Sequence, residues 1–381
     1  MENSIVGLDK LKGDWEHIDA IVPYGAGLEA LRTLKRIITE FNVPFIVDRD
    51  SNKSGQEIYG IPIENVDRLK NLKKNTKVLI TVAKRRYDEI KKTLENYGLE
   101  EDVDFCHISQ FGMEWYYKYR GECNIFTMDI TVTTYCTLHC KHCNMFVPHY
   151  KQPVMYRLDD FKRNIDCLFK RIDFVFAIGI LGGEAFVNPE LVQMLEYLCN
   201  NYHSRFGSVL VTTNGLTIPS EEMLKCFKIH DVIITISDYR SAIQGRSKIE
   251  ELSKLFEKEA IVYTKRESLV WCDFGFPHNP ADIKDSDCTD HMKNCDPGWR
   301  GLNDEKFYFC NVAWSAEKAG LFSLKKTDYL NLEELEPGSL VTKKKILSYT
   351  SGNIPGGYMS FCKVCRGCGE DNQEFVKAGE Q

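Results

Sequence analysis

Long hydrophobic runs are missing from this sequence of 381 residues. The longest apolar run, at 174–181, is far short of the roughly 20 residues that a membrane-spanning helix needs. The first residues, MENSIVGLDKLKGDWEH, lack the basic start and the apolar centre of a secretory signal. An excess of basic residues is missing too, since the net charge is −6. We therefore expect a cytoplasmic protein with neither a membrane nor a nucleic acid as its partner.

Cysteine, by contrast, is abundant, with 15 in the chain. Disulfides are rare in a reducing compartment, where clustered cysteines more often hold a metal or take part in catalysis. Three form one cluster, Cys136-x3-Cys140-x2-Cys143, in the stretch DITVTTYCTLHCKHCNMF. Seven more lie beyond residue 270: Cys272, Cys288, Cys295, Cys310, Cys362, Cys365 and Cys368. The other five are isolated and are interpreted as small apolar core residues: Cys106, Cys123, Cys167, Cys199 and Cys226.

The length and the 43% of hydrophobic residues predict two or three domains with sizeable cores. Residues 18–110 alternate between apolar strands and helical patterns, which is typical of a Rossmann-like α/β domain. Its first turn reads GAGLEA from Gly25, and Asp48 ends the next strand, so the positions match a dinucleotide-binding fingerprint. Small glycine turns also serve simply to begin a helix tightly. We therefore expect a docking or vestigial domain and leave nucleotide binding open.

From residue 125 the alternation continues with longer spacing. Strands are predicted at 125–133, 174–180, 208–213, 232–237 and 260–264. Helices are predicted between them, at 158–170, 189–201, 220–228 and 247–258. At least five β-α steps in this order predict a partial or complete parallel barrel. Beyond residue 270 the periodicity ends, and a region rich in Gly, Pro, Asp and Cys needs cysteine–metal links to be stable.

Four motifs follow four successive strands of the predicted barrel. They are the cysteine cluster, LGGE at 181–184, TTNG at 212–215 and SDY at 237–239. Because the carboxyl ends of parallel barrel strands open on one face, where active sites form, the motifs should meet there. Three thiolates at this spacing suit either zinc, with His139 or His142 as the fourth ligand, or an iron–sulfur cluster. A [4Fe–4S] cluster held by three cysteines leaves one iron open to a small molecule.

The sequence CTLHCKHC resembles the C-x3-C-x2-C signature of the radical S-adenosylmethionine (radical SAM) superfamily, and the resemblance covers about 125–264. It implies a [4Fe–4S] cluster on the three cysteines, an open iron that chelates SAM, and reductive cleavage of SAM to a 5′-deoxyadenosyl radical. The residues expected to contact SAM are His142, Gly182, Gly183, Glu184, Thr213, Asn214 and Ser237. The residue before the third cysteine is usually aromatic in the family, so His142 is a departure. Glu184 is the residue that would pair with the methionyl ammonium group.

The later cysteines resemble the auxiliary-cluster domain of radical SAM enzymes, called SPASM or, in its shortened form, twitch. The resemblance implies a second [4Fe–4S] cluster on Cys295, Cys310, Cys362 and Cys365. Cys288 and Cys368 stay open as replacements, and a zinc knuckle in CKVCRGC stays an alternative. Glu305 stands where the family has a glycine, five residues before the second cysteine. The expected domains are a Rossmann-like domain (1–118), a radical SAM partial (β/α)6 barrel (119–270) and a small C-terminal domain stabilised by its iron–sulfur cluster (271–381).

The resemblance predicts a radical SAM enzyme that takes hydrogen from its substrate and receives electrons from a donor such as flavodoxin or ferredoxin. A carbohydrate, nucleotide sugar or similar polar metabolite is favoured, because the N-terminal domain resembles domains attached to sugar enzymes and has no winged-helix spacing. A peptide- or protein-modifying maturase and a non-catalytic, metal-stabilised binding protein stay open as alternatives. Asp238 and Tyr239 are candidate acid/base groups, although Asp238 could equally cap a helix. Cys272 is a candidate hydrogen donor for an epimerisation, while oxidation is slightly favoured.

Overall fold

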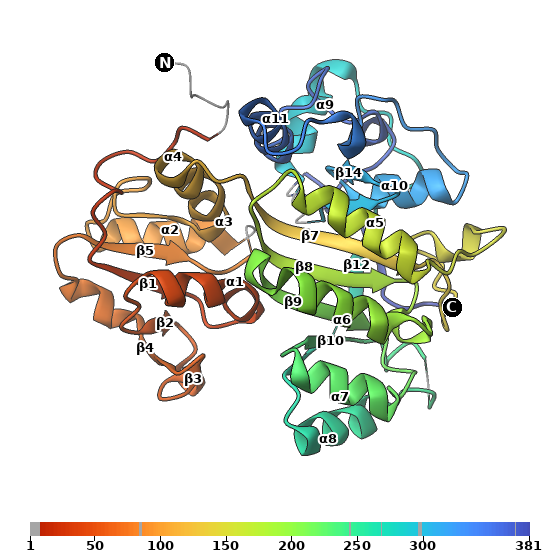
Figure 1. The fold of residues 1–381 in the computed structure, drawn as a ribbon, viewed down its shortest axis with the longest axis horizontal. Coiled ribbons are helices and arrows are strands. Elements are labelled where there is room, and N and C mark those ends of the chain that lie inside the picture. The colour runs from red at the N-terminus through yellow and green to blue at the C-terminus, as the bar shows by residue number, and fades with distance from the viewer. Residues whose placement is uncertain (1–7, 84–85, 244, 268, 296–298, 370) are drawn as a thin grey trace.

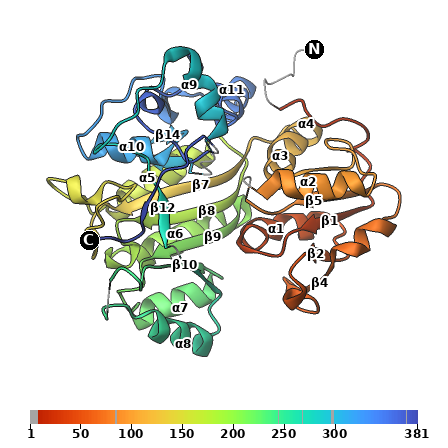
Figure 2. The same cartoon turned by 180° about the vertical axis from the view of Figure 1, so that it is seen from behind.

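The structure is a computed structural model, and it describes the chain apart from residues 1–7, 84–85, 244, 268, 296–298 and 370. Figures 1 and 2 show an N-terminal α/β unit beside a larger unit that contains the rest of the chain. Each unit is built around its own sheet. Within the described residues, no helix is both long enough and apolar enough to cross a membrane.

The N-terminal sheet has the strand order β3-β4-β2-β1-β5-β6. Its strands are β1 (Ala20–Tyr24), β2 (Ile46–Asp48), β3 (Glu57–Ile58), β4 (Ile61–Asn65), β5 (Thr76–Ile80) and β6 (Phe105–His107). Its helices are α1 (Leu28–Glu40) and α2 (Tyr87–Asn96), and the short α3 (Ile108–Gln110) and α4 (Tyr116–Arg120) lead to the second unit. All neighbouring strands pair parallel except β3 and β4, an unexpected antiparallel hairpin. The parallel order confirms the Rossmann-like arrangement.

The glycine turn after β1 is held by the acidic residue that ends β2. Gly25 has a φ of +119°, and a Cβ there would lie 2.5 Å from Val82 Cγ1, so only glycine fits. The Asp48 carboxylate accepts a hydrogen bond from the Ala26 N–H at 2.7 Å and pairs with Lys53 Nζ at 2.9 Å. In the dinucleotide fingerprint this carboxylate binds a ribose. Here it already has protein partners, which favours the docking interpretation.

The central sheet has the strand order β11-β10-β9-β8-β7-β13-β14-β15. The strands of its β-α steps are β7 (Asn124–Thr133), β8 (Phe174–Gly182), β9 (Phe206–Thr213), β10 (Ile233–Asp238) and β11 (Tyr263–Glu267). The helices that follow the first four of them are α5 (Leu158–Phe169), α6 (Leu191–Tyr202), α7 (Glu221–Ile229) and α8 (Ile249–Glu259). These five strands pair parallel in chain order, which confirms the α/β class and the partial barrel.

The last barrel strand begins later than the sequence pattern suggested. Residues 260–264 were expected as a strand, but Ala260 ends α8 in the left-handed conformation with a φ of +56°. The next strand along the chain, β12 (Val270–Cys272), pairs antiparallel with β16 (Phe375–Lys377) in a separate two-stranded sheet. In the part of the chain that the structure describes, the barrel therefore has five strands of the β-α type.

Helix α1 of the N-terminal unit packs against the inner face of the barrel, as Figure 1 shows beside β8 and β9. The side chains of Leu28 and Leu31 contact a small cluster made by Ala177, Leu210 and Ile233 on β8, β9 and β10. The neighbouring residues on these strands point to the outer helices, because side chains alternate along a strand. The N-terminal unit thus covers the inner face of the barrel away from its mouth.

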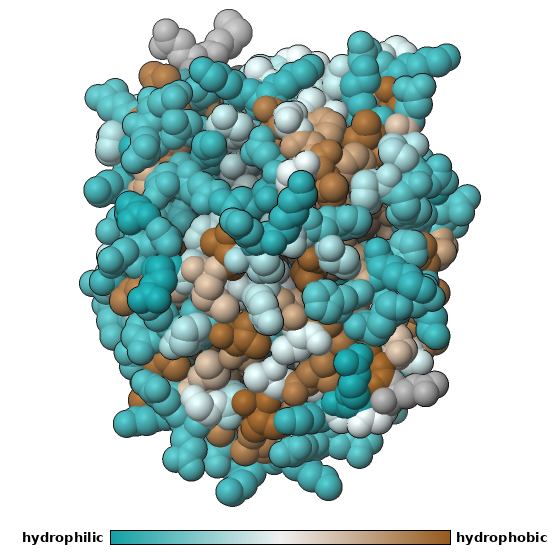
Figure 3. Space-filling view, turned by 90° about the vertical axis from the view of Figure 1, so that its right-hand side faces the viewer, coloured by the Kyte–Doolittle hydropathy of each residue, from teal (hydrophilic) through white to brown (hydrophobic). Residues whose placement is uncertain are grey.

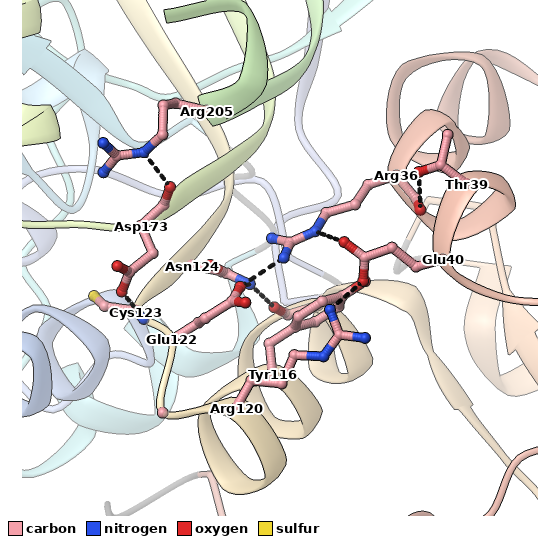
Figure 4. Close-up of polar contacts among 12 residues, drawn as sticks. Arg36, Thr39, Glu40, Tyr116, Arg120, Glu122, Cys123, Asn124, Asp173 and Arg205 are labelled. Atoms are coloured by element: carbon pink, nitrogen blue, oxygen red, sulfur yellow. Dashed lines mark hydrogen bonds and ion pairs between the residues drawn. The ribbon is translucent and has the colours of Figure 1, made fainter.

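Charged side chains join α1 to the segment that enters the barrel (Figure 4). Arg36 on α1 donates hydrogen bonds to Glu40 at 2.6 Å and to Glu122 at 2.7 Å. Arg120 of α4 also donates to Glu40, at 2.6 Å. Since Glu122 lies just before β7, this network fixes α1 relative to the first barrel strand.

The C-terminal region extends the barrel sheet at its other edge. Its elements are α9 (Asp285–Asn294), β13 (Gly301–Asn303), β14 (Lys306–Tyr308), α10 (Asn311–Lys318), β15 (Tyr329–Asn331) and α11 (Leu340–Thr350). Strand β13 pairs parallel with β7, and β14 and β15 follow antiparallel. The hairpin between β13 and β14 turns through Asp304 and Glu305, with φ of +52° and +54°. Glycine adopts this conformation without steric cost, which explains why the resemblance led us to expect glycine at Glu305.

Candidate functional site

The cysteine loop follows β7 at the carboxyl ends of the barrel strands, on the face that Figure 3 shows. Cys136, Cys140 and Cys143 come together there, close enough for their thiols to interact electrostatically. They pack with Leu138 and Ile243. Burial raises the pKa of the Cys136 and Cys143 thiols to about 11, so a bound cation has to replace their protons.

Nitrogen donors surround these sulfurs. Cys136 Sγ accepts hydrogen bonds from the Leu138 N–H at 3.4 Å and from Asn214 Nδ2 at 3.5 Å. Cys140 Sγ accepts one from Gln381 Nε2 at 3.3 Å. Asn214 also donates to Thr137 Oγ1 at 2.9 Å, so the end of β9 is tied to the cysteine loop. The sequence predicted that Asn214 would lie at this mouth, and the structure places it beside a cysteine.

The Gly-Gly-Glu motif continues from β8 under the cysteine loop. A Cβ on Gly183 would lie 2.3 Å from the Tyr135 carbonyl oxygen, so the backbone approach requires glycine. The Glu184 side chain is buried, and its carboxylate accepts hydrogen bonds from Phe186 N at 3.1 Å and Asn214 N at 2.8 Å. Burial raises the pKa of Glu184 to about 7. The Thr213 hydroxyl also hydrogen-bonds this carboxylate, so three of its four lone-pair sites are engaged.

The Ser-Asp-Tyr motif at the end of β10 divides between two faces. Ser237 lies on the inner face with Ile233, whereas Asp238 lies on the outer face, by the alternation of strand side chains. Asp238 is buried in an ion pair with Arg240, at 2.8 Å. Tyr239 is partly buried, and the desolvation of its hydroxyl raises its pKa to about 12; its ring lies edge-on to the Trp271 ring. The structure thus brings Ser237 and Tyr239 near the predicted site, while Asp238 already has a cationic partner.

Four of the later cysteines line a single cavity. They are Cys295, Cys310, Cys362 and Cys365. The cavity walls include Phe274, Trp299, Phe309 and Phe361. Burial raises the pKa of Cys310 to about 11 and that of Cys365 well above its usual range. Among the described residues, these are the four thiols that the cavity brings together, and they are the four named from the sequence.

Comparison with known proteins gives a sequence relative and weaker structural likenesses. No family model matches the chain. A curated relative, the antilisterial bacteriocin subtilosin biosynthesis protein AlbA of Bacillus subtilis (strain 168), is 35% identical over 109 residues. The match covers 28% of this chain and 22% of AlbA, so it spans less than a quarter of the relative.

Solved structures give weaker likenesses. Streptococcus suis SuiB bound to S-adenosylmethionine is 16% identical, with 48% of this chain and 46% of that chain covered and a TM-score of 0.32. BtrN in complex with AdoMet and 2-DOIA is 14% identical, with 66% of this chain and 98% of BtrN covered and a TM-score of 0.41. Because these TM-scores lie below 0.5, the structural likenesses carry no argument about the function of this chain.

The donor sets of the two cysteine sites fit iron–sulfur clusters. Thiols are the usual ligands of such clusters, and three gather on one loop while four line one cavity. The apolar walls of the second site suit a cluster shielded from water. Zinc would also accept four thiolates, so the metal itself stays a prediction.

Three further cysteines lie around the second site. Cys368 Sγ is 3.9 Å from Cys295 Sγ, so it remains a candidate replacement ligand. Cys288 is buried and interacts electrostatically with Cys362. Cys272 Sγ lies 3.7 Å from the Gly367 carbonyl oxygen and interacts electrostatically with Cys295. The predicted hydrogen donor therefore borders the four-cysteine cavity.

A polar group whose association was not predicted from the sequence lies between the two cysteine sites. His142, Asp273 and His278 bring one ligand atom each to within 4.8 Å of one another. The His278 ring contacts the Asp273 carboxylate at 3.2 Å and the His142 ring edge-on. His142 Nδ1 is buried and has no hydrogen-bond partner in the described part of the chain. His278 follows no motif, so only the folding of 273–278 against the cysteine loop brings these residues together.

Proposed function

We propose that this protein is a radical SAM enzyme with an auxiliary iron–sulfur cluster. The meeting of three thiols, the Gly-Gly-Glu turn and Asn214 at one barrel mouth carries the proposal. In it, Cys136, Cys140 and Cys143 hold a [4Fe–4S] cluster. That cluster, with SAM on its open iron, would supply a 5′-deoxyadenosyl radical that takes hydrogen from a substrate. Anaerobic reconstitution with SAM and a reductant, with 5′-deoxyadenosine measured, tests it; no product would reject it.

The residues around the loop have distinct proposed roles toward SAM. The close backbone turn at Gly182 and Gly183 lets a ligand approach the main chain. Glu184 offers its remaining lone pair to the methionyl ammonium group, and Ser237 faces the barrel interior. Thr213 and Asn214 lie at the end of the next strand as ribose contacts. His142 lies within the loop with a buried, unpartnered nitrogen, which suits a contact to the bound nucleoside.

The auxiliary cluster is assigned to Cys295, Cys310, Cys362 and Cys365. With four protein ligands no iron is open to substrate, so the residues of this site support electron transfer rather than substrate binding. The favoured outcome is an oxidation in which the substrate loses two hydrogen atoms, one to the radical and one as a proton with its electron passed on. A flavodoxin or ferredoxin would supply electrons for the SAM cleavage.

An epimerisation is distinguished from this oxidation by turnover in deuterated water. Epimerisation needs a hydrogen atom returned to the substrate radical, and Cys272 near the second site is the candidate donor. Solvent deuterium at the reacting carbon, lost in Cys272→Ala, would reject oxidation. A product two hydrogens lighter, made equally by the Cys272→Ala variant, would support it.

A polar metabolite such as a carbohydrate or nucleotide sugar is the proposed substrate. The N-terminal unit supports this because it is a parallel α/β sheet rather than a winged helix. A peptide substrate is the second candidate, because the printed name of AlbA refers to the biosynthesis of a bacteriocin. Parallel assays with a nucleotide-sugar panel and a peptide library separate the two. A metal-stabilised binding protein without catalysis would contain metal but cleave no SAM.

A further inference from the structure

The segment that follows β16 lies directly on the cysteine loop. The Lys141 N–H donates a hydrogen bond to the Glu380 carbonyl oxygen at 2.7 Å, and Lys141 Nζ pairs with the Glu380 carboxylate at 3.0 Å. The His139 N–H donates to Gln381 Oε1 at 3.0 Å. Three contacts thus join residues 380–381 to the stretch between the first and third cysteines.

Gln381 makes a fourth contact, to a predicted cluster ligand. Its Nε2 donates to Cys140 Sγ at 3.3 Å and to the Gly379 carbonyl oxygen at 2.8 Å. Its Oε1 is engaged by the His139 N–H, so the side-chain amide is fixed at both ends. The donors to Cys136, by comparison, come from its own loop and from the end of β9. Cys140 therefore receives its side-chain donor from a part of the chain far away in sequence.

The segment is held in place by structure of its own. Strand β16 pairs with β12, and the Ala378 N–H donates to the Leu269 carbonyl oxygen at 3.0 Å. Ala378 is fully buried, and a Cβ on Gly379 would lie 2.8 Å from Tyr239 Cβ, so the backbone passes Tyr239 closely. The contact with Cys140 is thus supported by the strand pair and by packing, which is the condition for a defined hydrogen bond.

We propose that Gln381 is a positioning residue whose amide N–H to the Cys140 sulfur raises the reduction potential of the cluster on the three-cysteine loop. A hydrogen bond to a ligand sulfur withdraws negative charge from it, and this favours the reduced cluster, which carries one more electron. The inference rests on the proposed function, since it needs a cluster on Cys136, Cys140 and Cys143. It adds a residue that the cysteine signature does not contain.

The test is a redox titration of the reconstituted full-length protein, followed by the part of the EPR signal that changes on addition of SAM. In Gln381→Glu the donor is replaced by a carboxylate oxygen, so the potential should fall. At the midpoint potential of the wild-type cluster, the reduced fraction of the variant's cluster should be lower by about threefold or more, for a one-electron couple. Gln381→Ala should shift it less, because it adds no charge. Gln193→Glu makes the same change at an exposed position of α6 and should leave the potential unaltered.

The other possible results overturn either the role of Gln381 or the proposed function. Fully loaded Gln381→Glu and Gln381→Ala proteins with the wild-type potential would overturn the proposal. If both variants lose the SAM-responsive cluster, the milder Gln381→Asn variant is measured instead. An unchanged reduction potential in Gln381→Asn would also overturn the proposal, and the segment would then serve only to stabilise the cysteine loop. A SAM-responsive signal that is missing from the unaltered protein would instead overturn the proposed function. The signal that does not respond to SAM serves as the internal reference and should keep its potential throughout.

Discussion

The two cysteine sites of this protein are built in opposite ways. The first takes three thiols from one loop, within the eight residues 136–143, at the mouth of the barrel. The second takes four thiols from before β13, after β14 and around 362–365, and they line a cavity with aromatic walls. A loop can present three ligands and leave room for a small molecule. A cavity closed by distant segments surrounds its metal with protein ligands.

This difference shows how far the spacing of cysteines in the sequence can predict a metal site. Cys136, Cys140 and Cys143 are neighbours because a short loop leaves them no other arrangement. Cys310 meets Cys362 and Cys365 only because β13 and β14 join the barrel sheet and the later chain returns over them. The first site should therefore depend on the loop and the barrel ends, and the second on the packing of the C-terminal region.

Replacement of Cys136, Cys140 and Cys143 together by Ala should have the largest effect. The protein should keep about half of roughly eight irons, because only the auxiliary cluster would remain, and it should cleave no SAM. Iron and acid-labile sulfide analysis after anaerobic reconstitution measures this. Cys199→Ala, an isolated buried cysteine on α6, is the control and should keep all the iron. Full iron in the triple variant would remove the loop from the metal site.

Cys365→Ala should separate the two sites. The variant should lose the auxiliary iron but still cleave SAM, because the loop at the barrel mouth takes no ligand from Cys365. The oxidised product should disappear while 5′-deoxyadenosine is still formed, and both can be followed by mass spectrometry. If SAM cleavage disappears while the first cluster is intact, the two sites are not functionally separate.

Glu184→Ala should separate SAM binding from iron binding at the first site. SAM binding should weaken by about tenfold or more, because a charge-assisted hydrogen bond contributes roughly 1.5–3 kcal/mol. Iron content should be unchanged, since the carboxylate contacts backbone N–H groups and binds no iron in the proposal. Equilibrium binding to the reconstituted protein measures the affinity. Glu196→Ala, at an exposed position of α6, is the matched control; equal SAM affinity in both variants would exclude Glu184 from the SAM site.

His291→Asn should have the smallest effect and act on the second site alone. His291 borders the four-cysteine cavity, with Nδ1 2.7 Å from Asp371 and Nε2 2.9 Å from the Cys365 carbonyl oxygen. Loss of these contacts should reduce the free energy of unfolding by about 1–2 kcal/mol. Thermal unfolding measures the stability, and release of iron to a chelator measures the lifetime of each cluster. A faster release from the three-cysteine loop would contradict the separation of the sites.

Several features of the site could be predicted because they depend on residues close together in the chain. The strand periodicity placed the four motifs at the ends of β7 to β10, and the structure confirms those strands. Asp238 shows the limit of that reasoning. Its position after Ser237 suggested a catalytic role, but one step along a strand reverses the side chain, and Arg240 pairs with it on the outer face. The role of Asp238 as an acid or base therefore stays a prediction, and its carboxylate is already paired with Arg240.

The sequence by itself determined the α/β class, the five barrel strands and the grouping of three thiols on one loop. Periodicity and short-range spacing are local properties, which the chain carries in any environment. Only the tertiary structure decided that α1 covers the inner face of the barrel and that His278 lies beside His142. It also decided that Gln381 donates to Cys140. These contacts join residues that are far apart in sequence, and packing fixes them, because many backbone paths would satisfy the same local pattern.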